Sequence, residues 1–305
     1  MKVLLATEKP FAPAAVEDIR DILTKAGHSL VVLEKYKDKA ELADAMADAE
    51  ALIVRSDKIT AELIAGAPAL RIIVRAGAGY DNIDLAAATA AGVVVENTPG
   101  QNSRAVAEMV TAMAITALRN GFDGTTGGEI SGKRLGLQGY GQVSRNVRAI
   151  LSGFGVNISA LDPYCSAEAI EADGVRPVDN AEDLYAQSDI LSIHIPATNE
   201  TVGSIGRGLI DRLPKGAVLI NTARKEVIDE AALDEILGER PDLKYYADVR
   251  PDNAPVLLEK YAGRVFFTPK KCGAQTREAN VNAARAAARQ IVSFFAEGST
   301  LYKVN

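Results

Sequence analysis

The chain of 305 residues is long for one compact core, which predicts two domains. It is 48% hydrophobic and 24% charged, which is ordinary for a soluble globular protein. Its formal net charge of −6 offers no basic surface for nucleic acid, and its apolar runs are too short to span a membrane. Two cysteines, Cys165 and Cys272, are too few for a disulfide framework and favour a reducing cytoplasm.

Strand and helix signals alternate from the first residues. The segment 2–6 is apolar after Lys2 and Glu8 follows it, which predicts a first strand rather than a signal peptide. The segment 14–26 has helical periodicity, with Pro13 suited to its first turn and Gly27 to its end. Further strands are predicted at 30–33, 51–54, 71–74 and 93–95, with helical segments between them that include 86–91. This alternation predicts parallel strands joined by crossover helices.

A second series of strands follows a loop and a long helix. The loop is 97–103, the helix runs from Ser103 to about Asn120, and five glycines fall within 121–132. Strands are then predicted at 134–137, 157–161, 190–193, 217–220, 245–247 and 265–267. The last helical segment, 277–296, is expected to return to the first lobe. The expected fold is α/β, with two Rossmann-like doubly wound lobes, parallel sheets and a cleft between them.

The segment 133–164 has the order of elements that a dinucleotide needs: a strand, a glycine turn, a helix, and a second strand that ends in an acid. Gly139 allows the tight turn, and Gly141 lets the backbone approach a pyrophosphate at the start of the helix, where Gln142 and Val143 lie. Asp162 can accept hydrogen bonds from a ribose diol and would repel a 2′-phosphate. The sequence therefore favours NAD over NADP.

One position departs from the glycine pattern of dinucleotide-binding segments, called the fingerprint here. Ser144 occupies the third position, where the pattern has glycine or alanine, and adds an oxygen to a close helix–strand contact. An ordinary glycine turn of an α/β sheet is the competing interpretation of the segment.

Further motifs with characteristic residues are distributed over nearly the whole chain. They are 75–84 (Arg-Ala-Gly-Ala-Gly-Tyr-Asp-Asn-Ile-Asp), 97–103 (Asn-Thr-Pro-Gly-Gln-Asn-Ser), 189–196 (Asp-Ile-Leu-Ser-Ile-His-Ile-Pro), 219–224 (Leu-Ile-Asn-Thr-Ala-Arg), 247–249 (Ala-Asp-Val) and 268–269 (Thr-Pro). In this order the chain resembles the D-isomer-specific 2-hydroxyacid dehydrogenase family. Within it, the chain is most similar to the short phosphoglycerate dehydrogenases, which implies no serine-sensing regulatory domain. The resemblance assigns 1–99 with 276–305 to a substrate-binding catalytic domain and 100–275 to an NAD-binding Rossmann domain.

The resemblance also implies roles for residues that would bind the substrate. Arg224 matches the arginine that holds the carboxylate and carbonyl of a 2-hydroxy acid, a task that suits the fork of a guanidinium. Gly77 and Ala78 would offer backbone amides to the same carboxylate. Arg55 and Arg75 are similar to a pair that reaches a substrate phosphate, although either could instead form a salt bridge at the rim of the site.

On the cofactor side, Asp248 resembles the residue that holds the nicotinamide carboxamide, and Thr222, within the 219–224 motif, is also expected to bind the cofactor. His194 and Pro196 would form part of the cofactor wall, although a core histidine is an equally simple interpretation of His194. We assign no proton transfer to it. No cluster of histidine, cysteine and acids has the spacing of metal ligands, so no metal site is expected.

The chain departs from the family at the catalytic base, which is usually a histidine after Thr-Pro, paired with a glutamate. Here Lys270 and Lys271 follow Thr-Pro, and no glutamate follows Asp248-Val249 at the usual place. A subgroup of the short enzymes carries lysine at the histidine position. Counting from Thr-Pro assigns the role to Lys270, whereas counting back from Gly273 favours Lys271.

The absence of the usual histidine and the absence of its partner glutamate have one physical explanation. A free lysine, with a pKa of about 10.4, is a poor base at neutral pH, and burial or neighbouring positive charge lowers a lysine's pKa. A partner glutamate would have the opposite effect, so its absence is consistent with a lysine base. The competing interpretation is that both lysines are solvated surface cations.

The resemblance thus implies NAD-dependent oxidation of a phosphorylated 2-hydroxy acid, D-3-phosphoglycerate, by an enzyme that forms a homodimer through its NAD domain. The net charge and the short apolar runs predict that it binds neither nucleic acid nor membranes. A glyoxylate or hydroxypyruvate reductase is the alternative within the class. A binding protein that senses NADH without catalysis is the alternative outside it.

Overall fold

The computed structural model describes residues 1–305, which divide into two compact units. Unit 1 comprises Met1–Asn102 and Gln275–Asn305, and unit 2 comprises Ser103–Ala274. The chain therefore passes from one unit to the other twice. No helix is long and apolar enough to cross a membrane, and no group of three or more histidine, cysteine or acidic residues could hold a metal ion.

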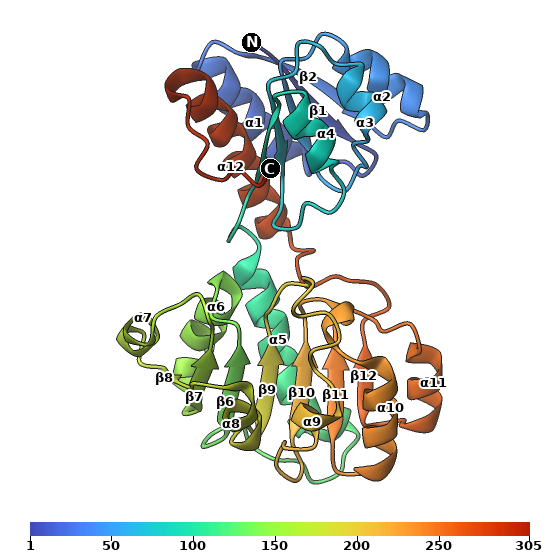
Figure 1. Ribbon diagram of the computed structural model, residues 1–305, viewed down its shortest axis with the longest axis vertical. Helices are drawn as coiled ribbons and strands as arrows, with labels where there is room; N and C mark the ends of the chain where they lie inside the picture. Colours follow the sequence, from blue (N-terminus) through green and yellow to red (C-terminus); the bar gives the residue numbers. More distant parts are fainter. The chain divides into compact units, whose positions relative to one another are not determined.

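Unit 1 is built on a five-stranded parallel sheet with the order β2-β1-β3-β4-β5. Its strands are β1 (Lys2–Thr7), β2 (Ser29–Glu34), β3 (Ala51–Val54), β4 (Ile72–Arg75) and β5 (Val94–Asn97). Its helices are α1 (Pro13–Lys25), α2 (Lys39–Met46), α3 (Ala61–Ala65), α4 (Leu85–Ala90) and α12 (Arg277–Glu297). Figure 1 shows α1 and α12 together on one face of this sheet, and α2, α3 and α4 on the other.

Both faces of the unit 1 sheet are buried, which explains why its strands are continuous apolar runs rather than alternating ones. In β1, Val3 and Leu5 pack toward α1 and α12, whereas Leu4 and Ala6 pack toward α2 and α3. Successive side chains of a strand point to opposite faces, so an uninterrupted run fills two cores at once. The packed face of α12 is rich in alanine, and small side chains let it approach α1 and the sheet closely.

Unit 2 is built on a seven-stranded parallel sheet with the order β12-β11-β10-β9-β6-β7-β8. Its strands are β6 (Arg134–Gln138), β7 (Asn157–Leu161), β8 (Arg176–Pro177), β9 (Ile190–Ile193), β10 (Val218–Asn221), β11 (Lys244–Ala247) and β12 (Val265–Phe267). Its helices are α5 (Ser103–Leu118), α6 (Gln142–Leu151), α7 (Ala167–Ala172), α8 (Ala181–Ala186), α9 (Arg207–Ile210), α10 (Glu230–Glu239) and α11 (Ala254–Lys260), with 3₁₀ turns η1 (Asn120–Phe122), η2 (Ser152–Phe154) and η3 (Lys225–Val227).

The strand order of unit 2 changes direction at β6, which has β7 on one side and β9 on the other. Helices α5 and α6 pack on one face of the sheet, and α8 to α11 pack on the other (Figure 1). In open α/β sheets, ligands bind beyond the carboxyl ends of the strands at such a switch point. The topology therefore predicts a ligand site at the carboxyl end of β6.

The predicted fold class is confirmed, because both sheets are parallel and covered by helices. Strands were predicted with the observed bounds at 51–54, 157–161, 190–193 and 265–267. The two-residue strand β8 was not predicted, because it is short and contains Pro177.

The predicted end of α5 at Asn120 was wrong by two residues. The helix ends at Leu118, and Asn120 has a positive φ of 49°. The Lys244 ammonium donates hydrogen bonds to the Ala117 carbonyl and to the Asn120 side chain, both at 2.6 Å. A cation at the carbonyl end of a helix satisfies groups that the helix leaves unpaired. This contact joins residues more than 120 positions apart, so the local sequence could not indicate it.

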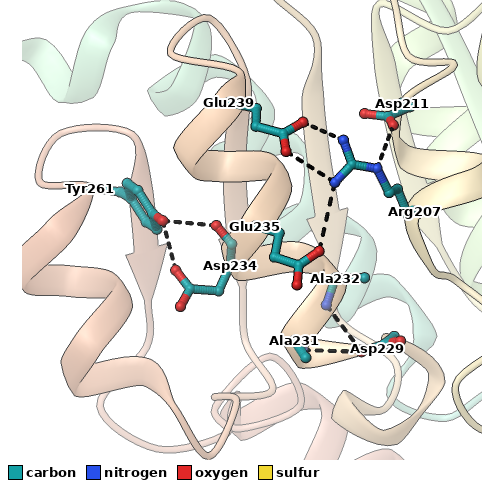
Figure 2. A network of polar contacts seen from close by, with 9 residues as sticks. All are labelled: Arg207, Asp211, Asp229, Ala231, Ala232, Asp234, Glu235, Glu239 and Tyr261. Atoms are coloured by element: carbon teal, nitrogen blue, oxygen red, sulfur yellow. Dashed lines mark hydrogen bonds and ion pairs between the residues drawn. The ribbon is translucent and has the colours of Figure 1, made fainter.

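Figure 2 shows the polar network that fixes α10 in unit 2. Arg207 of α9 forms ion pairs with Asp211, Glu235 and Glu239, and it reaches Asp211 at 3.2 Å. Asp229 caps α10 by accepting hydrogen bonds from the first backbone amides of the helix at 3.0 and 3.1 Å. Exposed ion pairs stabilise a protein weakly, so the network orients α10 more than it stabilises it.

Candidate active site

The turn after β6, called the glycine turn here (139–141), has the geometry that the fingerprint predicts. Gly139 has φ +91°, and a β-carbon there would lie 3.0 Å from the carbonyl atoms of His194. Gly141 is the N-cap of α6, and a β-carbon there would meet nothing within 4 Å. The first position thus needs glycine for its conformation, and the second leaves room for a group that contacts the backbone amides at the start of α6.

Asp162 follows β7 and is bound to one backbone amide within the glycine turn and to another just after Asp162 itself. Its two carboxylate oxygens accept hydrogen bonds from the amides of Tyr140 at 2.6 Å and Tyr164 at 2.8 Å. The predicted ribose acceptor is therefore held in one orientation beside the turn. Asp162 itself is partly exposed, and Tyr164 is 90% exposed.

Ser144, the departure from the fingerprint, is fully buried. Its hydroxyl donates a 2.5 Å hydrogen bond to the carbonyl of Gly139. The extra oxygen is therefore accommodated by the turn itself, where it links the first turn of α6 to the strand end. The glycine turn gains a contact that glycine or alanine could not make.

His194 lies at the end of β9, against the glycine turn. Its backbone amide donates to the carbonyl of Gln138 at 2.7 Å, and burial lowers the pKa of its imidazole to about 3. The ring is therefore neutral at physiological pH. Its Nε2 atom and the hydroxyl of Thr222 are both buried without a hydrogen-bond partner. His194 and Thr222 directly follow the paired strands β9 and β10, and two such atoms at these strand ends are compatible with a polar cofactor. Pro196, further along the loop, is exposed.

Asp248 holds the loop that carries the two lysines, a role that the sequence did not indicate. Its carboxylate accepts hydrogen bonds from the Thr268 hydroxyl at 2.9 Å and from the backbone amides of Cys272 at 2.8 Å and Gly273 at 2.9 Å. A β-carbon at position 273 would lie 2.9 Å from the same carboxylate, so the loop needs glycine there. Asp248 is 1% exposed, and these three bonds engage both oxygens of its carboxylate.

The Cys272 thiol lies in this loop, and burial and the Asp248 charge raise its pKa. A raised pKa keeps the thiol protonated at neutral pH, which favours a packing role over a reactive one.

Arg224 precedes η3, and its loop is fixed by the buried side chain of Asn221. Asn221 donates to the Arg224 carbonyl at 2.8 Å and accepts from the Ala223 amide at 3.0 Å. The carbonyl of Ala223 accepts from the Arg224 guanidinium at 2.9 Å and from the Lys271 ammonium at 3.3 Å. The structure therefore brings Lys271 next to Arg224, while Lys270 is exposed on the same loop.

In unit 1, Arg55 and Arg75 lie together at the ends of β3 and β4, and we call them, with Gly77, the arginine cluster. Arg75 donates to the Arg55 carbonyl at 2.9 Å. Its guanidinium lies over Gly77, where a β-carbon would come within 1.4 Å of it. Gly77 has φ +152°, and its carbonyl accepts from the amide of Thr98 at 2.9 Å. Ala78, the next residue, accepts from the Asn97 side chain at 2.6 Å.

Asp57, which the sequence did not single out, lies two positions after Arg55 and is 4% exposed. One of its carboxylate oxygens accepts from the Tyr36 hydroxyl at 2.7 Å and from the Glu8 amide at 2.6 Å, while the other has no hydrogen-bond partner. Burial lowers the pKa of Arg55, and the charge of Asp57 opposes that shift. Asp57 therefore favours the charged form of an arginine that is partly removed from water.

The chain matches a known family model over residues 4–305, described as D-isomer specific 2-hydroxyacid dehydrogenase, catalytic domain. The D-3-phosphoglycerate dehydrogenase of Methanocaldococcus jannaschii is 36% identical over 293 residues, which are 90% of this chain and 55% of the relative. That of Archaeoglobus fulgidus is 35% identical over 96% of this chain and 57% of the relative. The chain thus spans about half the length of these curated relatives.

A solved structure covers both chains more fully. The NAD⁺-bound 3-phosphoglycerate dehydrogenase of Entamoeba histolytica is 46% identical, with a TM-score of 0.90, over 100% of this chain and 98% of that one.

Proposed function

The chain belongs to the D-isomer specific 2-hydroxyacid dehydrogenase family, and from that premise we propose that it oxidises D-3-phosphoglycerate to 3-phosphohydroxypyruvate with NAD. The observation that carries the phosphorylated substrate is the arginine cluster, in which the Arg75 guanidinium donates to the backbone carbonyl of Arg55 and lies over Gly77. Two guanidinium groups at strand ends suit a phosphate dianion. The names of the relatives, D-3-phosphoglycerate dehydrogenases, support the same substrate.

The cofactor assignment rests on the glycine turn and its surroundings. The amides at the start of α6 would bind the pyrophosphate, and Asp162 would accept from the ribose diol and repel a 2′-phosphate. When bound, the nicotinamide supplies the acceptor for the hydride from C2 of the substrate. The proposed cofactor-binding residues are Gly139, Gly141, Gln142, Val143, Asp162, His194, Pro196, Thr222 and Asp248. The similar enzyme of Entamoeba histolytica was solved with NAD⁺ bound, which is consistent with this assignment.

In the proposed reaction, Arg224 binds the substrate carboxylate together with the backbone amides of Gly77 and Ala78. A lysine takes the proton of the 2-hydroxyl group during oxidation and returns it, as an ammonium, during reduction. We assign this role to Lys270, by its position after Thr-Pro. Lys271 is the alternative, favoured by the carbonyl that it shares with Arg224.

The test is formation of NADH by the purified protein with NAD and 3-phosphoglycerate, followed from neutral to alkaline pH. D-glycerate, which lacks the phosphate, is the matched control. Turnover that is much faster with the phosphorylated acid than with D-glycerate and increases with pH supports the proposal. Reduction of glyoxylate or hydroxypyruvate without preference for a phosphorylated acid would instead support the alternative within the class. Tight NADH binding with no turnover in either direction would support a sensor.

We propose that the protein acts in the cytoplasm as a homodimer formed through unit 2. The family resemblance supports the dimer, and the two cysteines without a disulfide partner are compatible with a reducing compartment. Light scattering coupled to gel filtration tests the dimer.

A further inference from the structure

The guanidinium of Arg55 is held by contacts from two segments that are far from it in the sequence. Its carbon lies 5.2 Å from the centre of the Phe11 ring, in the loop after β1. One of its nitrogens, Nη2, donates a 2.6 Å hydrogen bond to the side-chain oxygen of Asn280, in the first turn of α12. Phe11 is 3% exposed, so the ring is a fixed surface. An arginine side chain that would otherwise sample many rotamers is thus confined to one orientation.

The chemistry of these two contacts differs from that of an ordinary ion pair. The Asn280 amide and the Phe11 ring both attract a guanidinium, yet neither carries a formal charge that would cancel it. The amide oxygen engages Nη2 and leaves the rest of the donor fork for an anion. A carboxylate at position 280 would form an ion pair with Arg55 and compete with any anionic ligand.

We infer that Asn280 is a positioning residue that orients Arg55 without neutralising it, and that it thereby sets the preference for a phosphorylated substrate. The inference rests on the proposed function, because it assigns the substrate phosphate to Arg55. Asn280 acts through Arg55 and does not itself touch the reacting atoms. Its loss therefore weakens binding of the phosphate and leaves the chemistry at C2 unchanged.

The test compares 3-phosphoglycerate with D-glycerate in Asn280→Ala, Asn280→Asp and a matched control, Asn282→Ala. Asn282 is exposed and lies two positions further along the same helix. In Asn280→Ala, KM for 3-phosphoglycerate should increase about tenfold with little change in kcat, while kcat/KM for D-glycerate stays within twofold. In Asn280→Asp the selective loss should be larger. Asn280→Gln, which keeps the amide, should recover part of the preference, and Asn282→Ala should match the wild type with both acids.

The outcomes separate this inference from the function on which it rests. An equal loss with both acids in Asn280→Ala, or no loss with either, overturns the inference while 3-phosphoglycerate oxidation by the wild type stands. If the wild type itself does not prefer the phosphorylated acid, the proposed function fails and the inference with it. The thermal unfolding midpoint of each variant shows whether a loss reflects a less stable fold.

Discussion

The glycine turn of unit 2 and the arginine cluster of unit 1 are both suited to anions, but they are built in different ways. The glycine turn uses backbone amides, and its parts are close in sequence except for Asp162 and His194. The arginine cluster uses long side chains, oriented by Phe11 and Asn280, which come from opposite ends of the chain. A backbone site is fixed by the fold itself, whereas a side-chain site depends on a few contacts that single substitutions can remove.

This difference has a kinetic consequence under the proposed function. Groups of unit 2 would contact the cofactor and the reacting carbon, so their loss should affect phosphorylated and unphosphorylated acids alike. Groups of the arginine cluster would contact the phosphate, so their loss should affect one acid selectively. The lysine and Arg55 variants test this division.

The largest effect is expected for the lysines. If Lys270 is the general base, Lys270→Ala should lower kcat by about 10²–10⁴-fold with both acids, because a positioned base contributes roughly that factor. Lys271→Ala should then have a much smaller effect, and the reverse result would transfer the role to Lys271, which contacts the Ala223 carbonyl. Steady-state kinetics with 3-phosphoglycerate and D-glycerate decide between them. Nearly full activity in both variants would mean that the lysines are solvated cations.

A smaller but selective effect is expected for Arg55→Met. The variant keeps an apolar side chain over Phe11 and removes the charge, so kcat/KM for 3-phosphoglycerate should fall by about 10–100-fold. The value for D-glycerate should stay near that of the wild type, and the ratio of the two is the measurement. A similar fall with both acids would show that Arg55 contributes to the fold or to the chemistry rather than to phosphate binding. It would contradict the expectation that the arginine cluster affects only the phosphorylated acid.

The same contrast explains what the sequence could predict. The parallel sheets followed from apolar runs and turn signals, which are local, and the glycine turn followed from a motif of neighbouring residues. The roles of Asn280 and Phe11 could not be predicted, because they depend on α12 and the loop after β1 meeting at Arg55. Asp248 was singled out, but its bonds to the lysine loop join residues about 20 to 25 positions apart and follow no motif.

If His194 is a neutral part of the unit 2 core, the stability of the protein should depend on pH. Its folded-state pKa of about 3 lies below the ordinary value of 6.5, so between these values the unfolded chain binds a proton that the folded chain does not. The free energy of unfolding should therefore decrease as pH falls through this range, by up to about 1.4 kcal/mol per pH unit.

The glutamine of His194→Gln cannot titrate. The free energy of unfolding of this variant minus that of the wild type should therefore be about 2 kcal/mol larger at pH 5 than at pH 7. Urea unfolding of both proteins at the two pH values gives this difference directly, and the carboxylates that both share cancel. A constant difference between pH 7 and pH 5 would mean that the folded protein can protonate His194.

The smallest effect is expected for Ser144→Ala, which restores the residue type of the fingerprint. The hydroxyl donates to the Gly139 carbonyl, so its loss removes a buried hydrogen bond and should lower the free energy of unfolding by about 1 kcal/mol. The amides at the start of α6 keep their positions, so the Kd for NAD should change by less than about threefold. Calorimetry gives both values. A large loss of NAD affinity with unchanged stability would show that the serine acts on the cofactor, and that even the backbone site depends on a single side chain.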